Sequence, residues 1–202
     1  GIDPVGELNQ KSLEKVESLL KIKTPRLITV SRFDKRKNHE KIIMALRNLK
    51  QLYPDIIYIC IGYGDEEENI KKLVGELDLV SQVMFFKDIS DDLKKALIAK
   101  SNIFVMPSII YKTSVEGFGI AYIEAAQYSI PSLGGSDGGA PDAIKHEITG
   151  KICDGNNLDD IYSSLNSMIE NKKYHVLGKN AKEYVSKFHW EKIMEEYKKI
   201  LN

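Results

Sequence analysis

The sequence has no strong excess of any kind, and what it lacks narrows what the protein can be. Lysine plus arginine and aspartate plus glutamate both number 29, so no net charge draws the chain to nucleic acid or to an anionic membrane. No apolar run reaches the length of a membrane-spanning helix, and no signal peptide opens the chain. We therefore expect no nucleic-acid partner and no transmembrane segment.

Cysteine and histidine are scarce, and their placement argues against several kinds of site. The two cysteines, Cys60 and Cys153, lie apart in apolar surroundings, which favours a reducing, intracellular setting. The four histidines show no metal-ligand spacing, and no Ser-His-Asp triad, zinc motif or P-loop is recognisable. We expect neither a metal nor a resident cofactor.

What the chain does have is an alternation of apolar strand-like runs and helical patterns. The predicted strands cover residues 26–31, 56–61, 83–86, 103–106 and a short run near 131–133. The predicted helices cover residues 65–77 and 91–99, begin near residues 38 and 119, and occupy most of the chain from residue 156. Such strands are typical of a parallel sheet covered on both faces, so we predict an α/β fold class, a doubly wound Rossmann-like sheet.

The two ends of the chain are amphipathic. Residues 7–21 have helical spacing, and residues 189–202 carry one apolar side formed by Trp190, Ile193, Met194, Tyr197 and Leu201. No linker or internal repeat interrupts the chain, so we expect one domain over residues 1–202. Either end could pack on the sheet or on something that is missing. Gly1 stands in place of a methionine, from which we expect a fragment or a processed chain.

The most informative segment is residues 114–124. Glu116 and Glu124 bracket a Gly-Phe-Gly turn that leads into a helix, where backbone N–H groups and the helix dipole favour an anion. Carboxylates suit hydroxyl groups, so a sugar nucleotide fits this arrangement. Alternatively, both glutamates are ordinary surface charges. Ile123 and Ala125 flank Glu124, which favours a packed position for Glu124, where it would need a partner.

A basic loop, residues 31–38, stands between a predicted strand and a helix. It contains the four cations Arg32, Lys35, Arg36 and Lys37. A diphosphate needs fixed positive charge, and arginine grips phosphate oxygens with a planar fork. The alternative is a solvated basic loop. We expect Asn38 to cap the following helix and His39 to be a surface residue of that helix, although His39 could touch a phosphate.

Two glycine-containing loops follow other strands. Residues 62–65 lack the third glycine of a dinucleotide fingerprint, because Glu67 occupies its place, so we predict a tight turn with Asp65 as a helix cap. Glycine in this turn would let a ligand approach the backbone. Residues 134–142 form either a mobile loop or a loop that lies against a ligand.

Together these segments resemble a known family. Their order along the chain is Arg32-x5-Lys37, Gly62-x-Gly64, Pro107-Ser108, Glu116-x7-Glu124, Gly138-Gly139-x-Pro141 and Thr149-Gly150. This order is similar to that of the C-terminal, donor-binding half of retaining GT-B glycosyltransferases, the glycogen-synthase-like and mannosyltransferase-like group (glycosyl transferases group 1). The similarity extends over nearly the whole chain. It implies a hexosyltransferase that uses a nucleotide-diphospho-sugar as its donor substrate.

The resemblance implies a role for each matching residue. Arg32 and Lys37 would hold the donor diphosphate and stabilise it as a leaving group, and Glu116 would face the donor sugar; these three form the implied catalytic set. Glu124 would take the ribose hydroxyls. The base would lie near residues 86–89. The other implied donor contacts are Gly62, Asp88, Ile89, Phe118, Gly119 and Ile120. This chemistry relies on positioning and charge stabilisation, without a metal.

The chain departs from the family pattern at two positions. Asn38 stands where many relatives have glycine, and Asp142 replaces a common glutamate. The insertion at residues 109–115 and the glycines at 138–139 look most like mannosyltransferases with lipid-linked acceptors, with GDP-mannose as a candidate donor. A polysaccharide acceptor is an alternative.

The resemblance also implies that half of the enzyme is missing. An N-terminal acceptor domain would precede this chain, with residues 1–24 at the domain junction and residues 189–202 as a helix that crosses back. The fragment alone would bind donor weakly and transfer nothing. We expect a cytoplasmic location, or the membrane surface for the full-length enzyme.

Other interpretations remain. A non-catalytic sugar-nucleotide sensor or scaffold would share the fold, although the candidate donor residues argue for intact binding. An inverting GT-B enzyme, such as a relative of UDP-N-acetylglucosamine epimerase, would have a similar donor site. The incomplete glycine fingerprint argues against a nicotinamide-dependent oxidoreductase.

Overall fold

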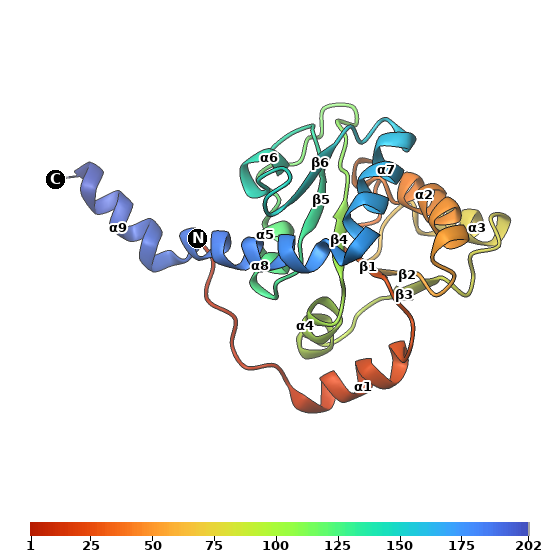
Figure 1. The fold of residues 1–202 in the computed structure, drawn as a ribbon. Helices are drawn as coiled ribbons and strands as arrows, with labels where there is room; N and C mark the ends of the chain where they lie inside the picture. The colour runs from red at the N-terminus through yellow and green to blue at the C-terminus, as the bar shows by residue number, and fades with distance from the viewer. Residues whose placement is uncertain (202) are drawn as a thin grey trace.

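The protein folds around one six-stranded parallel sheet, seen in a computed structural model that describes residues 1–201 (Figure 1). The strand order is β3-β2-β1-β4-β5-β6, and every neighbouring pair is parallel. The strands are β1 (Arg26–Val30), β2 (Ile57–Ile61), β3 (Val83–Phe86), β4 (Ile103–Met106), β5 (Ser132–Gly135) and β6 (Gly150–Cys153). The predicted doubly wound, Rossmann-like fold is therefore confirmed.

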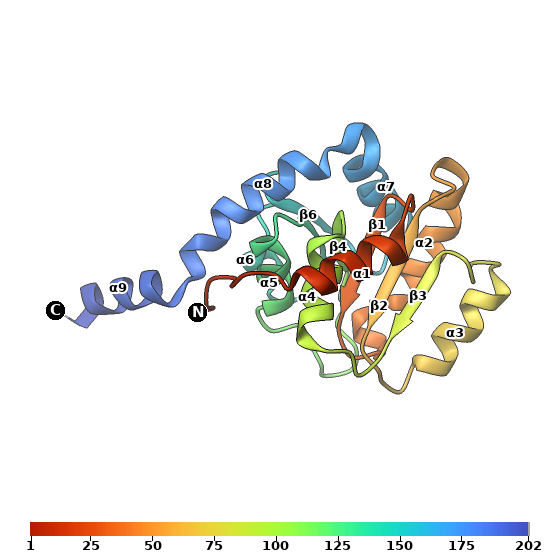
Figure 2. The ribbon, with the colours of Figure 1, turned by 90° about the horizontal axis from the view of Figure 1, so that it is seen from below.

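Helices cover both faces of the sheet (Figures 1 and 2). One face packs on α2 (His39–Leu52), α3 (Glu67–Glu76) and α7 (Leu158–Ile169). The other packs on α1 (Gln10–Leu20), α4 (Asp91–Ala99), α5 (Ile120–Gln127), α6 (Ala140–Ala143) and α8 (Tyr174–Val185). None of the helices in the described part of the chain is long and apolar enough to span a bilayer.

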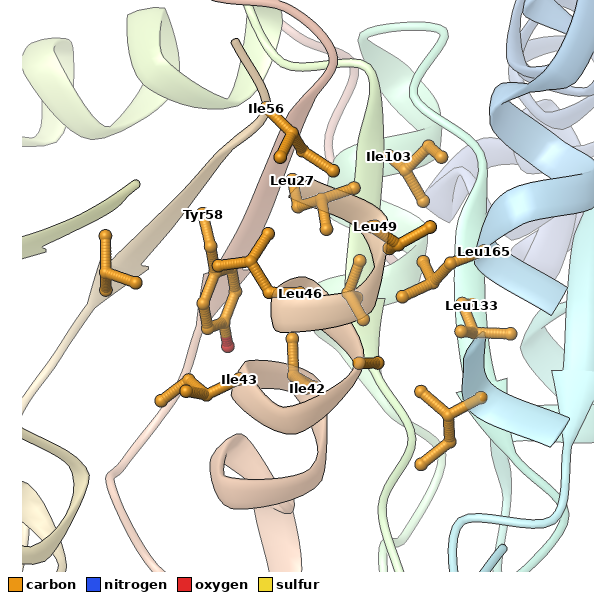
Figure 3. Packing of buried hydrophobic residues seen from close by; sticks show 14 of the residues in the cluster. Leu27, Ile42, Ile43, Leu46, Leu49, Ile56, Tyr58, Ile103, Leu133 and Leu165 are labelled. Carbon is orange, nitrogen blue, oxygen red and sulfur yellow. The ribbon is translucent and has the colours of Figure 1, made fainter. Parts of the chain in front are cut away.

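The strand sequences explain why there are two cores. Successive side chains of a strand point to opposite faces, so Leu27 enters the core beneath α2 while Ile28 enters the core beneath α4 and α5. Ile103 and Phe104 of β4 divide in the same way. Figure 3 shows the first core, in which aliphatic side chains of α2 lie against the sheet beside Tyr58. Both faces of these strands are buried, as their continuous apolar sequences require.

Most predicted elements are observed, with shifts at their ends. β3, β4 and α4 have the predicted bounds. The strand β6 was not predicted. The expected cap at Asp65 is wrong, because α3 begins at Glu67 with Glu66 in the cap position and without a side-chain cap bond.

The ends of the chain differ in how they pack. Asn9 caps α1 by accepting a hydrogen bond from the N–H of Ser12, and α1 buries Val16 and Leu20 beside α4. The last helix, α9 (Trp190–Leu201), instead extends away from the sheet beyond α8 (Figures 1 and 2). Its side chains Trp190, Met194 and Tyr197 are 50%, 49% and 58% exposed. Asn202, the last residue of the predicted C-terminal segment, lies outside the described residues.

Candidate functional site

The site lies where the order of the strands reverses. β1 is the first strand of the chain and pairs with β2 on one side and β4 on the other, so the connections that leave the carboxyl ends of β1 and β4 turn to opposite faces. Ligands of open α/β sheets bind in the crevice at this position. The loop after β1 is the basic loop, residues 31–38. The loop after β4 contains Ser108 and Glu116.

An ion-pair cluster joins these two loops. The Oε2 atom of Glu116 lies 2.5 Å from Nη1 of Arg36 and 2.5 Å from Nζ of Lys37. Ser108 adds a longer hydrogen bond, 3.4 Å from its Oγ to the same oxygen. The side chains of Arg36, Lys37 and Glu116 are only 11–16% exposed. One carboxylate and two cations thus meet in a partly buried position at the reversal point.

The two cations determine the protonation of Glu116. Burial by itself would raise the pKa of this carboxyl group, but the hydrogen bonds and charges of Lys37 and Arg36 outweigh burial and hold the pKa below its usual value. Glu116 is therefore ionised near neutral pH. It is available as a hydrogen-bond acceptor and cannot act as a general acid there.

Backbone contacts fix the two loops against each other. The N–H of Ile109 donates to the carbonyl of Arg36 (3.0 Å). The side chain of Asn38 donates to the carbonyls of Pro107 (3.0 Å) and Gly155 (2.7 Å) instead of capping α2, so the predicted cap bond is wrong although Asn38 does occupy the cap position. Asn38 has a φ of 63°, a left-handed conformation that asparagine and glycine adopt most readily.

The turn before α5 offers free donors beside this cluster. Gly119 has a φ of +74°, and a Cβ there would lie 2.4 Å from the Tyr122 ring, so the turn requires glycine. Within residues 1–201, the N–H groups of Gly117, Phe118 and Gly119 donate to no other backbone group. They lie next to the positive end of α5 and are thus suited to an anion.

The glycine-rich loop, residues 134–142, packs against this turn. The N–H of Gly139 donates to the carbonyl of Glu116 (3.0 Å), and a Cβ at Gly139 would lie 1.6 Å from the carbonyl oxygen of Gly117. These glycines therefore allow one backbone to approach another. Two alternatives were predicted for residues 134–142, a mobile loop and a loop that lies against a ligand. The close packing of Gly139 against residues 116 and 117 explains this glycine without either of them.

The turn after β2 and the residues after β3 continue the site along the carboxyl ends of the strands. Gly62 donates its N–H to Phe86 (3.0 Å), and the N–H of Phe33 in the basic loop donates to Tyr63 (2.9 Å). Beyond Phe86, Asp88 is exposed with a φ of 52°, and Ile89 is half-buried. The sequence-predicted Gly62, Asp88 and Ile89 therefore follow β2 and β3, beside the basic loop.

Arg32 and Glu124 lie outside the ion-pair cluster. Arg32 is exposed and forms no ion pair with the described residues. Glu124 is also exposed, so the expected packed position with a partner is wrong. α5 buries its neighbours Ile123, Ala125 and Tyr122, and the remaining strip of the helix, with Glu124, faces solvent.

Two residues of the cluster were missed. Arg36 was recognised only as one of four cations, and Ser108 only as part of a motif. The sequence carried one indication: Asp34 precedes three consecutive cations, and its carboxylate accepts from the N–H of Lys37 (3.1 Å), which starts the 3-10 turn Lys35–Lys37. That turn directs Arg36 and Lys37 toward the same carboxylate.

His39 is not the surface residue that was expected. It is 1% exposed, and its ring bonds Tyr58 through Nδ1 (2.8 Å) and Ser31 through Nε2 (3.1 Å). Burial and the charge of Lys37 lower the pKa of His39 from 6.5 to about 3, so the ring is neutral at physiological pH. The residue therefore packs beneath the basic loop.

Comparison with known proteins identifies the family. The family model of glycosyl transferases group 1 matches residues 10–184. The chain belongs to this family. A related protein, the GDP-mannose-dependent alpha-(1-6)-phosphatidylinositol monomannoside mannosyltransferase of Mycolicibacterium smegmatis, is 29% identical over 72% of this chain and 38% of its own length. An uncharacterized glycosyltransferase of Methanocaldococcus jannaschii is 30% identical over 98% of this chain and 49% of its own length.

Solved structures share the fold of this chain. HepE of Anabaena, in complex with UDP and glucose, superposes with a TM-score of 0.80 at 21% identity and covers 96% of this chain and 52% of its own. The C-terminal domain of a glycosyl transferase group 1 protein (LpcC) of Francisella tularensis has a TM-score of 0.75 at 22% identity and covers 94% of this chain and 100% of its own. The chain thus spans about half, or less, of the length of the curated relatives described above.

Proposed function

We propose that this chain is the C-terminal, donor-binding domain of a retaining glycosyltransferase and that it binds a nucleotide-diphospho-sugar. The observation that carries the proposal is the cluster of Lys37, Arg36 and Glu116 at the reversal point of a group 1 fold. It places fixed cations and a hydroxyl-binding carboxylate beside the free N–H groups that precede α5. These are the chemical partners that a diphosphate joined to a sugar requires.

Each donor group has a partner in this proposal. Lys37, with the exposed Arg32, neutralises the diphosphate and stabilises it as it leaves. Glu116 accepts from hydroxyls of the donor sugar, and Glu124 accepts from the ribose. The N–H groups of residues 118–120 contact the sugar and the distal phosphate. The base lies beside Gly62, Asp88 and Ile89, where backbone atoms contact most of it.

The reaction follows from charge and position. The C1–O bond of the sugar breaks as the diphosphate takes the electron pair, and cations and N–H groups stabilise that charge. The acceptor oxygen attacks the same face of the sugar, and its proton passes to the departing phosphate. The anomeric configuration is then retained. No protein nucleophile is required.

The donor and acceptor are proposed from similarity. Relatives named as GDP-mannose-dependent mannosyltransferases of a phosphatidylinositol glycolipid support GDP-mannose and a lipid-linked acceptor. HepE, solved with UDP and glucose, supports a uridine nucleotide instead. The acceptor would bind to a second, N-terminal domain, because the LpcC domain that this chain matches from end to end is a C-terminal one. Without that second domain the chain would transfer nothing.

Calorimetry with GDP, UDP and ADP tests the proposal. We expect one nucleotide to bind preferentially and Lys37→Ala, Arg32→Ala and Glu124→Ala each to weaken it. Lys50→Ala is the matched control, because Lys50 lies at the far end of α2 and pairs only with Asp78 among the described residues. Failure of all three nucleotides to bind contradicts the proposal. Binding that survives the first three substitutions means that the nucleotide lies elsewhere.

A further inference from the structure

The ion-pair cluster contains one more cation than its carboxylate needs. Both Arg36 and Lys37 donate to the same oxygen, Oε2 of Glu116, so the cluster carries one net positive charge. The remaining contact of Lys37 is with the thioether sulfur of Met106 (3.4 Å), which is a weak acceptor. Lys37 therefore keeps donor capacity that no strong acceptor satisfies among the described residues.

A donor diphosphate and Glu116 would compete for Lys37. If Lys37 turned to a phosphate and nothing else held Glu116, a largely buried carboxylate would lose its counter-ion, which strongly opposes the move. Arg36 removes this obstacle because it holds the same carboxylate independently. Its guanidinium is always charged and presents its donors in a rigid fork that suits a carboxylate.

The backbone between the two cations is held from both sides. The carbonyl of Arg36 accepts from the N–H of Ile109, which ties Arg36 to the loop that carries Glu116. The N–H of Lys37 donates to the carbonyl and the carboxylate of Asp34 within its own loop, both at 3.1 Å. The peptide unit between Arg36 and Lys37 is thus held at both ends, and the two residues differ in their side chains: Arg36 presents a rigid guanidinium fork, whereas the ammonium of Lys37 lies at the end of a flexible stem.

We propose that Arg36 is a positioning residue. It stays paired with Glu116 as a fixed counter-ion, so that the ammonium of Lys37 can move from Glu116 to the donor diphosphate. This inference rests on the proposed function, and it adds a residue that acts without touching the donor. Arg36 neutralises Glu116 before the nucleotide arrives and after it leaves. The carboxylate is thereby kept in place for the sugar.

A double-mutant cycle tests the role of Arg36. The ligand is whichever of GDP, UDP and ADP binds the unsubstituted chain most tightly, and its affinity is measured by calorimetry for Arg36→Gln, Glu116→Gln and the double variant. Arg36→Gln should weaken binding by about tenfold or more, because Lys37 then stays on Glu116. In the Glu116→Gln background the same substitution should change affinity by less than about threefold, because no carboxylate competes.

Two further variants serve as controls. Arg36→Lys keeps the charge and should retain affinity within about threefold. Lys41→Gln removes a charge from α2 whose Nζ bonds the carbonyl of Asn156 (2.7 Å), away from Glu116, and should leave affinity unchanged.

The outcomes separate this inference from the proposed function. An equal loss from Arg36→Gln in both backgrounds overturns the inference, because Arg36 would then contact the phosphate directly. A lowered melting temperature together with a loss that Glu116→Gln does not relieve also overturns it, in favour of a purely structural role. If the unsubstituted chain binds none of the three nucleotides, the proposed function falls, and the positioning role falls with it.

Discussion

The ring Nδ1 of His39 lies 2.8 Å from the hydroxyl oxygen of Tyr58, so the first residue of α2 is tied to the middle of the sheet. The hydrogens of this network can be assigned. The only hydroxyl hydrogen of Thr29 goes to the carbonyl of Val105, so Tyr58 must donate to Thr29 (2.8 Å) and accept from His39. In the neutral ring Nε2 of His39 then carries no proton, and it lies 3.1 Å from the hydroxyl of Ser31, whose single hydrogen is also within reach of the carbonyl of Arg32.

The lowered pKa of His39 predicts a pH dependence of stability. The folded chain has a pKa of about 3 for His39, well below the ordinary 6.5, so between these values the unfolded state binds a proton that the folded state does not. The free energy of unfolding should therefore fall as the pH falls from 6.5, by about 1.4 kcal/mol per pH unit from this group. Urea titrations between pH 4 and 8 measure the slope.

The matched variant is His39→Asn, whose side-chain N–H can replace the Nδ1 donor but cannot titrate. It should be less stable than the unsubstituted chain above pH 7 and should lack this part of the slope. An unchanged slope in the variant would show that other groups, such as ion-paired carboxylates, cause the acid sensitivity.

Tyr58→Phe tests the same network from the opposite side. Tyr58 is fully buried, and Figure 3 shows it among the aliphatic side chains of the core. Removing its hydroxyl leaves the N–H of His39 without an acceptor, which should cost roughly 1–3 kcal/mol of unfolding free energy. Tyr53→Phe is a control, because its hydroxyl bonds Asn166 in a partly buried position and the cost should be smaller. Equal costs would mean that the network adds nothing beyond one ordinary hydrogen bond.

The fold was predictable because most strands are recognisable from their local sequence alone. Ile103–Met106 is a short apolar run closed by Pro107, and the structure gives β4 the same bounds. β6 was missed because Gly150 and Lys151 break the apolar pattern. It is one of the two edge strands of the sheet and is buried only in part, so its sequence does not need to be continuously apolar.

The site was less predictable because its geometry depends on contacts between distant loops. The sequence could suggest Lys37 and Glu116, but nothing local shows that Arg36 and not Arg32 would join them, since the 3-10 turn decides which cations point inward. The position of His39 also depends on contacts with residues that are distant in the sequence. Its neighbours Asn38 and Glu40 look like an exposed helix start, whereas its partners Tyr58 and Ser31 come from two strand regions.

Gly139→Ala should damage the donor turn. An added Cβ would lie 1.6 Å from the carbonyl oxygen of Gly117, so the backbone of residues 116–118 must move. We expect a lower melting temperature and nucleotide affinity reduced by about tenfold or more, because the free N–H groups of the turn are displaced. Differential scanning fluorimetry and calorimetry on the same samples measure both effects.

The control for this prediction is Gly75→Ala. Gly75 lies in α3 with nothing within 4 Å of an added Cβ, so alanine should stabilise the chain by roughly 0.5–1 kcal/mol and leave nucleotide affinity unchanged. If Gly139→Ala behaved like Gly75→Ala, the close approach of the two backbones would have no role in holding the donor turn.

Removal of residues 190–202 should cost the domain little stability. Trp190, Met194 and Tyr197 expose about half of their surface, and α9 extends away from the sheet (Figure 2). The loss at the start of α9 is small: Trp190 donates its N–H to Ile2, and its ring lies against Gly1. In contrast, Leu46→Ala in the fully buried core should cost about 2–5 kcal/mol. Thermal melts of the truncated chain and of Leu46→Ala make the comparison directly. A truncation as costly as the core substitution would show that α9 packs on this domain in solution, and a truncation that costs little fits an apolar face reserved for a partner such as the proposed N-terminal domain.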